Sequence, residues 1–141
     1  MEEKKPDYWY LQSAVVPYRM VDDTPEIMMI TSRKKKRWVV PKGIIEPDLP
    51  APESAAKEAW EEAGIKGDLL DGTLGSYKYQ KWAGTCTVDV FVMRVTEEAD
   101  KWLEDFRDRQ WVSVDEAVKR IKEPALKEMV GRVNAFIHQY S

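Results

Sequence analysis

The chain has 141 residues, which suits a single domain spanning residues 1–141, and its 43% hydrophobic content with six tryptophans is enough for a sizeable core. A formal net charge of −3 with 33% charged residues indicates a soluble protein and argues against general binding of nucleic acid. No apolar run approaches the roughly 18 residues that span a bilayer, so we expect no membrane partner.

Three strands are predicted in the first forty residues, after an acidic N-terminus that does not resemble a signal peptide. Residues 8–18 are rich in aromatic and apolar side chains and predict a strand that ends at Pro17, because proline has no amide to donate to a sheet. Residues 27–31 predict a second strand after a turn at residues 22–25, and residues 38–40 predict a third.

A run of five basic residues, 33–37, connects the second and third predicted strands. Such a run is commonly a solvated loop, and it can also serve as a nuclear localisation signal or a nucleic-acid patch. Its position shortly before an acidic helix favours a third interpretation, the binding of phosphate groups. Arg33 and Arg37 flank the loop and are better candidates for these contacts than the central lysines.

The most informative segment is a predicted helix at about residues 53–63, which follows a break at residues 41–43 and a loop that contains prolines. Glu58, Glu61 and Glu62 are spaced i, i+3 and i+4, so they share an arc of about 100° on one face of a helix with 3.6 residues per turn. Like charges at this spacing destabilise a helix. A solvated acidic face is the simpler interpretation, and a site for a hard divalent cation such as Mg²⁺ is the functional one.

The second half of the chain predicts three strands and two helices, which together indicate an α/β fold with a mixed sheet. Residues 86–95 are largely apolar and predict a central strand. Cys86 is the only cysteine, so an intrachain disulfide is excluded and we expect a cytoplasmic location. The other predicted elements are a strand at 69–79 interrupted by glycines, a strand at 110–112, a helix from a capping box at 113–116 to about 121, and an amphipathic helix that begins at Pro124.

Four further residues have two interpretations each. Tyr77, Tyr79 and Trp82 could stack on an adenine base, but filling the core or lining a hairpin is the favoured interpretation. His138 is the only histidine and lies near the C-terminus, which argues against a histidine-based triad or a zinc site. We expect it on the surface of the last helix.

Residues 43–65 resemble the signature of the Nudix hydrolases, Gly-x5-Glu-x7-Arg-Glu-U-x-Glu-Glu-x-Gly-U, in which U is a bulky aliphatic residue. The positions that match at the right spacing are Gly43, Glu58, Glu61, Glu62, Gly64 and Ile65. The departures are Leu49 for the first glutamate, Lys57 for the arginine and Ala59 for the aliphatic residue. The resemblance implies the Nudix fold, an α/β/α sandwich with a mixed sheet.

The resemblance also implies a role for individual residues. Mg²⁺, or Mn²⁺ in its place, would be held by the carboxylates of Glu58, Glu61 and Glu62, which are then also the catalytic residues. The backbone carbonyl of Lys42, just before the signature glycine, would be a further metal ligand. The family's arginine orients the carboxylates, and Lys57 keeps the charge of that arginine without its planar, bidentate fork.

Outside the signature, the chain resembles the branch of diphosphoinositol polyphosphate phosphohydrolases, which also cleaves diadenosine polyphosphates. In that branch, arginines at the positions of Arg33 and Arg107 contact the polyphosphate. With Arg37 and Lys42, these two residues form the expected substrate-binding set. The segments that carry the resemblance are 32–33, 37–38, 95–97, 102–104 and 107–111. In place of the branch's basic residues, the chain has Tyr10, Gln12 and Glu123.

The expected function is Mg²⁺-dependent hydrolysis of a phosphoanhydride bond in a small phosphorylated substrate, in which a carboxylate accepts a proton from the attacking water. Two alternatives stay open. One is a catalytically weak Nudix-fold module that binds a phosphorylated ligand, and the other is a pyrophosphohydrolase of the nucleotide pool or of RNA 5′ ends. Neither a nucleic-acid partner nor a particular oligomeric state is indicated by the sequence. The candidates for the general base are Glu58, Asp89, Glu97 and Glu98.

Overall fold

The computed structural model describes residues 3–140, and within them eight strands and four α-helices follow one short 3-10 helix. The first half of the chain is mainly strands around one long helix, and the last three helices follow one another at the C-terminal end. The elements are η1 (Asp7–Tyr10), β1 (Leu11–Val21), β2 (Thr24–Thr31), β3 (Trp38–Val39), β4 (Lys42–Ile44), α1 (Ala51–Ala63), β5 (Ile65–Leu69), β6 (Gly75–Lys81), β7 (Gly84–Glu98), β8 (Arg109–Ser113), α2 (Val114–Arg120), α3 (Pro124–Gly131) and α4 (Val133–Tyr140).

All the strands belong to one mixed sheet. The main path of hydrogen-bonded neighbours is β3-β2-β1-β7-β5, while β8 pairs with β2, β4 with β1, and β6 with β7. β1 and β7 run parallel, with Leu11 opposite Thr87 and Tyr18 opposite Arg94. The other paired strands are antiparallel. The predicted strand at residues 86–95 is therefore confirmed as a central strand, within the longer β7.

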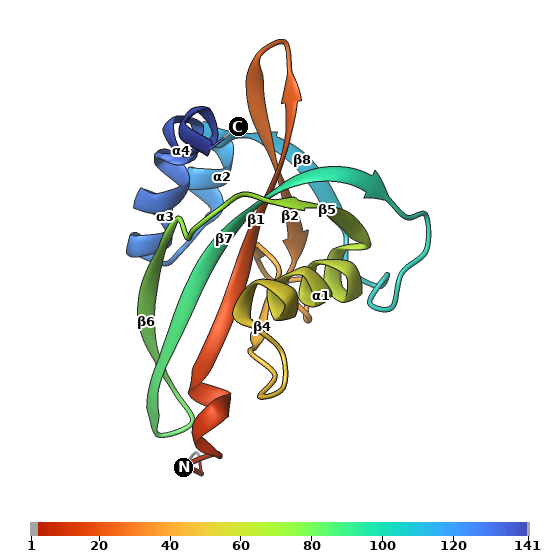
Figure 1. The fold of residues 1–141 in the computed structure, drawn as a ribbon. Helices are drawn as coiled ribbons and strands as arrows, with labels where there is room; N and C mark the ends of the chain where they lie inside the picture. The colour runs from red at the N-terminus through yellow and green to blue at the C-terminus, as the bar shows by residue number, and fades with distance from the viewer. Residues whose placement is uncertain (1–2, 141) are drawn as a thin grey trace.

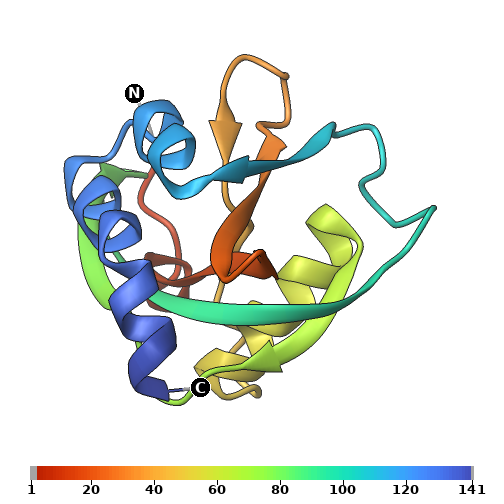
Figure 2. The same ribbon diagram turned by 90° about the horizontal axis from the view of Figure 1, so that it is seen from above.

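Helices cover both faces of this sheet (Figure 1, Figure 2). On one face α1 buries Ala55 and Ala59 in a core that includes Phe91. On the other face, α2, α3 and α4 form a second core with Val90 and Val92. Because successive side chains of a strand point to opposite faces, β7 supplies both cores, which explains why its middle is apolar at every position. The predicted α/β/α sandwich with a mixed sheet is confirmed.

The first strand continues through Pro17, so the predicted end of the strand at that residue is wrong. Along one edge of β1, residues 12–14 pair with β4 and residues 18–21 pair with β2. Pro17 lies between these two partners, where its missing amide interrupts neither ladder. Along the opposite edge, Pro17 keeps its place beside Met93 of β7. The proline marks a change of partner strand.

Other differences concern short elements. A break was expected at residues 41–43, but Lys42–Ile44 forms β4, and Ile65–Leu69 forms β5 directly after α1. The expected C-terminal helix is divided into α3 and α4 at Arg132, whose φ of −101° and ψ of 5° depart from helical values. The predicted helix start at Ser113 is confirmed, because the Ser113 hydroxyl accepts a hydrogen bond from the Glu116 amide at 3.1 Å. None of the described helices combines the length and the apolar character needed to cross a membrane.

Candidate active site

Helix α1 positions the acidic side chains that the sequence singles out. Its apolar face is buried, with Ala55, Ala59 and Ala63 fully inaccessible to solvent. Glu58 and Glu62, four residues apart, lie beside each other on the face that is turned toward β4. Glu62 is only 9% exposed, which is unusual for a glutamate. The helix therefore presents carboxylates at a buried place instead of at a solvated face.

The backbone of β4 approaches these carboxylates closely. The Lys42 amide donates a hydrogen bond to Glu62 Oε1 at 3.2 Å. A Cβ atom at Gly43 would lie 2.3 Å from the carboxyl carbon of Glu58, so the approach requires glycine at this position. In the ladder with β1, the Val15 amide donates a hydrogen bond to the Pro41 carbonyl. Successive residues of an antiparallel strand direct their amide and carbonyl groups alternately toward and away from the partner strand, so both groups of Lys42 point away from β1. Both groups thus face the Glu62 side.

The two carboxyl groups perturb each other. The pKa of Glu62 is raised to about 8, chiefly because burial disfavours the charged form and also because Glu58 is negative. Burial also raises the pKa of Glu58, and the negative charges of Glu61 and Glu104 act in the same direction. The pair shares a hydrogen bond that favours a proton on Glu62 and an ionised Glu58. A cation at this place would stabilise both ionised carboxylates.

The donors gathered here fit a hard divalent cation. Mg²⁺ is bound by carboxylate and carbonyl oxygens, and Glu58, Glu62 and the Lys42 backbone bring such oxygens together from α1 and β4. Glu61 shares the acidic face of the helix and acts electrostatically on Glu58. Within the part of the chain that the structure describes, no group of three or more His, Cys, Asp or Glu side chains is already gathered as a metal site. Coordination by Glu61 stays a prediction.

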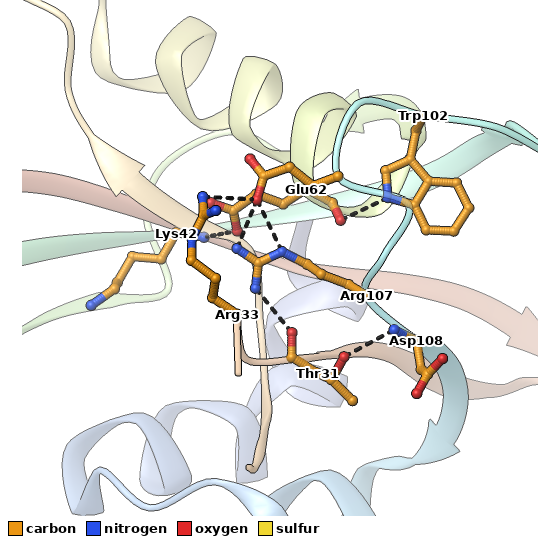
Figure 3. A network of polar contacts seen from close by, with 8 residues as sticks. Thr31, Arg33, Lys42, Glu62, Trp102, Arg107 and Asp108 are labelled. Atoms are coloured by element: carbon orange, nitrogen blue, oxygen red, sulfur yellow. Dashed lines mark hydrogen bonds and ion pairs between the residues drawn. The ribbon is translucent and has the colours of Figure 1, made fainter. Parts of the chain in front are cut away.

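Loop 99–109, which connects β7 to β8 and is taken to include Arg109, the first residue of β8, packs against the C-terminal end of α1. Figure 3 shows the Trp102 indole directed at the backbone of Glu62. The helix ends at Gly64, whose φ of +66° is the left-handed conformation that favours glycine. The carbonyls of residues 61, 62 and 63 accept hydrogen bonds, in that order, from the Glu104 amide at 3.0 Å, from Trp102 Nε1 at 3.0 Å and from Arg109 Nη1 at 2.7 Å.

The same loop carries Arg107, which is buried at 8% exposure. Its Nε and Nη2 donate to Glu104 Oε1 at 3.1 and 2.9 Å, and its Nη1 donates to the Thr31 carbonyl at 2.9 Å (Figure 3). Three of its donors are therefore used inside the protein. Arg33 approaches the same carboxylate at 3.4 Å, but its side chain is 72% exposed. Glu104 thus joins the two arginines that were expected to bind phosphate.

A cleft of about 290 Å³ opens over Glu62. One part of its lining is basic and brings together four of the expected substrate-binding residues with a fifth cation, Lys81. Another part is apolar and aromatic, with Trp38, Val40, Tyr77, Ile121 and Leu126. The expected residues in the basic part are Arg33, Arg37, Lys42 and Arg107. The structure therefore places the whole predicted substrate-binding set around one cavity.

Two cations in the cleft have partners that limit their freedom. Arg37 donates from both Nη atoms to Glu123 Oε2 at 3.1 Å, and both side chains are about one-third exposed. Lys42 Nζ donates to the Tyr79 hydroxyl at 2.8 Å. The pKa of Lys42 is lowered to about 8, first because burial disfavours the ammonium and then because Lys81 is close. Both cations are therefore held in defined directions at the edge of the cavity.

A comparison with protein families decides the identity of this fold. The model of the NUDIX domain matches residues 11–133. The chain belongs to the Nudix family. A Nudix relative, diphosphoinositol polyphosphate phosphohydrolase 3-alpha of Mus musculus, is 31% identical over 117 residues, which cover 81% of this chain and 70% of the relative. The resemblance to the diphosphoinositol polyphosphate phosphohydrolase branch is thereby supported.

Plant Nudix proteins are similar as well. Nudix hydrolase 13, mitochondrial, of Arabidopsis thaliana is 34% identical over 132 residues, and the match covers 77% of this chain but only 65% of that protein. Among solved structures, an Ap4A hydrolase binary complex from C. elegans superposes with a TM-score of 0.79 at 18% identity, covering 92% of this chain and 98% of that one. Such low identity establishes a shared fold and no more than the fold.

Some of the Nudix signature positions come together at the carboxylate pair, but Lys57 does not. Glu58 and Glu62 come together beside Gly43, as described. Lys57, which stands for the family's arginine, is exposed and binds Glu46 Oε1 at 2.6 Å. The lysine therefore anchors the loop before α1 and makes no hydrogen bond to the acidic cluster. Of the stacking candidates, Tyr77 and Tyr79 pack in or against the core and Trp82 packs in the β6–β7 hairpin against Trp9, while Tyr77 also lines the cleft.

Several residues of the site were not singled out from the sequence. Glu104 and Trp102 were quoted only as part of the branch resemblance, and Lys81 carried no signal in a chain that is rich in lysine. Glu123 was noted as an acidic residue where the branch is basic, and the structure shows that it lies in the cleft. Among the residues that were not predicted for the site, Glu123 is therefore the one whose sequence departure from the branch pointed to the cleft.

Proposed function

We propose that this protein is a divalent-metal-dependent hydrolase that cleaves a phosphoanhydride bond in a small phosphorylated substrate, such as a diadenosine polyphosphate or a diphosphoinositol polyphosphate. The observation that carries the proposal is a carboxylate pair in which the buried Glu62 lines a cleft with a basic rim and the half-buried Glu58 lies beside it. Membership of the Nudix family supports it independently.

The residues that would hold Mg²⁺, or Mn²⁺, are Glu58, Glu61, Glu62 and the carbonyl of Lys42. Such an ion supplies neutralisation of phosphate charge and a more acidic water. Glu58 is favoured as the base because it is half-buried beside Glu62 and carries the charge of the pair. None of Glu58, Asp89, Glu97 and Glu98 lines the cleft itself, and Glu58 is the candidate that shares a hydrogen bond with the cleft residue Glu62.

The basic rim would bind and orient the phosphate chain. Lys42 and Arg33 present charged donors at the cavity, and hydrogen bonds to charged groups are the stronger class. Arg107 contributes its charge from a fixed, buried position while its hydrogen bonds support Glu104 and Thr31. Arg37 becomes available to a substrate to the extent that it releases Glu123.

The apolar part of the cleft favours a substrate with one uncharged half. Trp38, Ile121 and Leu126 offer surface to a planar base or a sugar, and Glu123 can accept hydrogen bonds from hydroxyl or amino groups. A densely phosphorylated inositol would instead bring phosphate toward the carboxylate of Glu123. Of the two substrate classes, this lining favours a dinucleoside polyphosphate.

The test is product release from diadenosine tetraphosphate and from a diphosphoinositol polyphosphate, each with Mg²⁺, with Mn²⁺ and with a chelator. We expect metal-dependent turnover of both and a higher kcat/KM for the diadenosine compound. Binding of either compound without turnover would contradict the hydrolase and support the second candidate, a binding module. That candidate is favoured by Lys57, which contacts Glu46 and not the carboxylate pair.

The Glu123→Lys variant sharpens the choice of substrate. Reversing this charge is expected to raise kcat/KM for the inositol compound about tenfold, which corresponds to about 1.4 kcal/mol, the size of a weak charged hydrogen bond. Glu128→Lys makes the same charge change on the exposed face of α3, where the Glu128 side chain is 76% exposed. Equal effects of the two variants would show that Glu123 does not select the substrate.

We also propose a cytoplasmic location, on the ground of the single buried cysteine, Cys86. The names of the plant relatives place those proteins in other compartments, such as the mitochondrion. Imaging of a C-terminal fluorescent fusion would decide, and an organellar pattern would overturn the proposal.

A further inference from the structure

The last turn of α1 carries two of the proposed metal ligands, Glu61 and Glu62. At the C-terminal end of a helix, the final carbonyls have no partner within the helix and form the negative end of its dipole. Two carboxylates are unfavourable there, and helix ends fray. A metal site at this end needs something outside the helix that fixes its backbone.

Loop 99–109 meets this need with donors on three successive carbonyls of the last turn, residues 61–63. The donor on the Glu62 carbonyl is a side chain, the Trp102 indole, at 3.0 Å. The backbone of Glu62 is thus held from one side by Trp102, while its carboxylate is held from another by the Lys42 amide at 3.2 Å. The two contacts together leave this glutamate little freedom.

The indole itself is rigidly placed. A Cβ atom at Gly64 would lie 2.8 Å from Cγ of Trp102, so the ring lies directly against the left-handed cap of the helix. The Arg109 guanidinium stacks 4.1 Å from the centroid of the same ring. Trp102 is not among the residues that line the cleft. We therefore expect Trp102 to act on the reaction indirectly, through the backbone of α1 that its indole contacts.

We propose that Trp102 is a positioning residue for the metal site, because its indole N–H fixes the backbone of Glu62 and so the direction of the Glu62 carboxylate. The inference rests on the proposed function, since the carboxylate is positioned for a cation. Removal of a group that hydrogen-bonds and orients a metal ligand, without contacting the metal, typically lowers metal affinity or activity by about 10–100-fold.

The test uses Trp102→Phe, which keeps an aromatic ring on Arg109 and removes the N–H donor. Trp111→Phe is a matched control, because the Trp111 indole also donates to a glutamate, Glu98 Oε1 at 3.3 Å, and also stacks with an arginine. Binding of Mn²⁺ is measured by titration calorimetry without substrate, and kcat and KM are measured with diadenosine tetraphosphate.

We expect Trp102→Phe to weaken Mn²⁺ binding and to lower kcat, each by about tenfold, with KM unchanged within twofold. Trp111→Phe should leave all three values unchanged. Equal Mn²⁺ affinity and kcat in the two variants would overturn the positioning role while leaving the hydrolase intact. If the unmodified protein neither binds Mn²⁺ nor hydrolyses the substrate, the proposed function fails, and the positioning role falls with it.

A measurement on the unmodified protein keeps the proposal testable if Trp102→Phe does not fold. Tryptophan indole N–H signals are resolved by nuclear magnetic resonance, and those of Trp102 and Trp111 are followed during titration with Mg²⁺. The Trp102 signal should shift with the binding curve, and the Trp111 signal should stay in place. A stationary Trp102 signal under saturating Mg²⁺ would contradict the coupling.

Discussion

The two sides of the cleft are built in opposite ways. Glu62 on α1 is 9% exposed and receives the Lys42 amide, while the carbonyls around it are held by loop 99–109. Across the cavity, the side chain of Arg33 is 72% exposed and reaches its partner only at 3.4 Å. The carboxylate side is fixed before any ligand arrives, whereas the basic side combines a fixed, buried cation, Arg107, with the solvated side chain of Arg33.

This difference in rigidity suits the proposed binding of a metal ion on one side and of a phosphate chain on the other. Oxygen ligands must meet a small ion at defined positions, so their order has to be established by folding. Phosphate chains differ in length and are recognised by charge, and an exposed cation such as Arg33 can adapt to them at a cost in side-chain entropy. Substitutions on the carboxylate side should therefore act on turnover, and those on the basic side should act on affinity and on the choice of substrate.

The largest effect is expected from Glu62→Gln. The amide removes a proposed metal ligand from the centre of the carboxylate side, so Mg²⁺-dependent turnover should fall by more than about 100-fold. Glutamine is neutral, the form that burial favours at Glu62, so the melting temperature should be unchanged or higher. Glu53→Gln on the exposed first turn of the same helix is the control. Activity within a few-fold of the unmodified protein would refute the metal site.

The stability of the carboxylate side should depend on pH. The pKa of Glu62 is raised from 4.5 to about 8 in the folded protein, chiefly by burial. Between these values the folded state holds a proton that the unfolded chain has released, so the free energy of unfolding falls as the pH rises. With a chelator present, raising the pH from 5.5 to 7.5 should cost about 2 kcal/mol more in the unmodified protein than in Glu62→Gln. Urea denaturation at several pH values measures the difference, and identical profiles would show that Glu62 is ionised throughout.

On the basic side, Arg33→Ala should weaken kcat/KM for long diadenosine polyphosphates by about tenfold, because one charged hydrogen bond contributes about 1.5 kcal/mol. The loss should grow with the length of the phosphate chain. Lys35→Ala should matter less, since Lys35 is at the loop tip and pairs with Asp108 at 3.8 Å. Equal losses across the series, or a larger loss for Lys35→Ala, would show that this loop does not bind the polyphosphate.

Unlike Arg33→Ala, Arg107→Ala is expected to affect stability as well as substrate binding. The sequence predicted a substrate contact, but the structure shows hydrogen bonds to Glu104 and to the Thr31 carbonyl. Removing the arginine takes its donor from the Thr31 carbonyl and leaves Glu104 with only the long contact to Arg33 that the structure shows, so a loss of stability accompanies any loss of affinity. The exposed Arg33 is the cleaner probe of substrate binding.

The smallest effect is expected at Lys57. This residue binds Glu46 outside the acidic pair, and exposed ion pairs contribute little, so Lys57→Ala should lower kcat by only about twofold to threefold. Lys57→Arg should keep or raise activity, because a guanidinium is a bidentate donor for carboxylates. Steady-state measurement of kcat for both variants tests these expectations. A loss of more than tenfold for Lys57→Ala would mean that Lys57 orients the carboxylates during turnover.

The sequence predicted the site best where the determinants are local. The helical spacing of Glu58 and Glu62 and the position of Gly43 before them were sufficient to indicate a carboxylate pair. The course of β1 through Pro17 was missed, because the change from β4 to β2 along its edge depends on strands that are distant in sequence. The division of the last helix at Arg132 was missed, although Gly131, a weak helix former, stands directly before the break.

Contacts between distant segments explain the other misses. Trp102 meets Glu62 across 40 positions, and Arg107 meets Thr31 across 76. The sequence around a tryptophan or an arginine has no spacing pattern that predicts a hydrogen-bond partner so distant in the chain. The burial of Arg107 therefore could not be anticipated, although its place at the cleft was.

The parallel pairing at the centre of the sheet has a consequence for how the chain acquires its fold during synthesis. Residues 11–18 of β1 align with residues 87–94 of β7, so neither core can close until the second of these segments has left the ribosome. A hairpin such as β1–β2 can form earlier, but it lacks its central neighbour until then. Pairings between such distant segments slow folding. The time between synthesis of β2 and of β7 is therefore the interval in which this protein depends most on protection from aggregation.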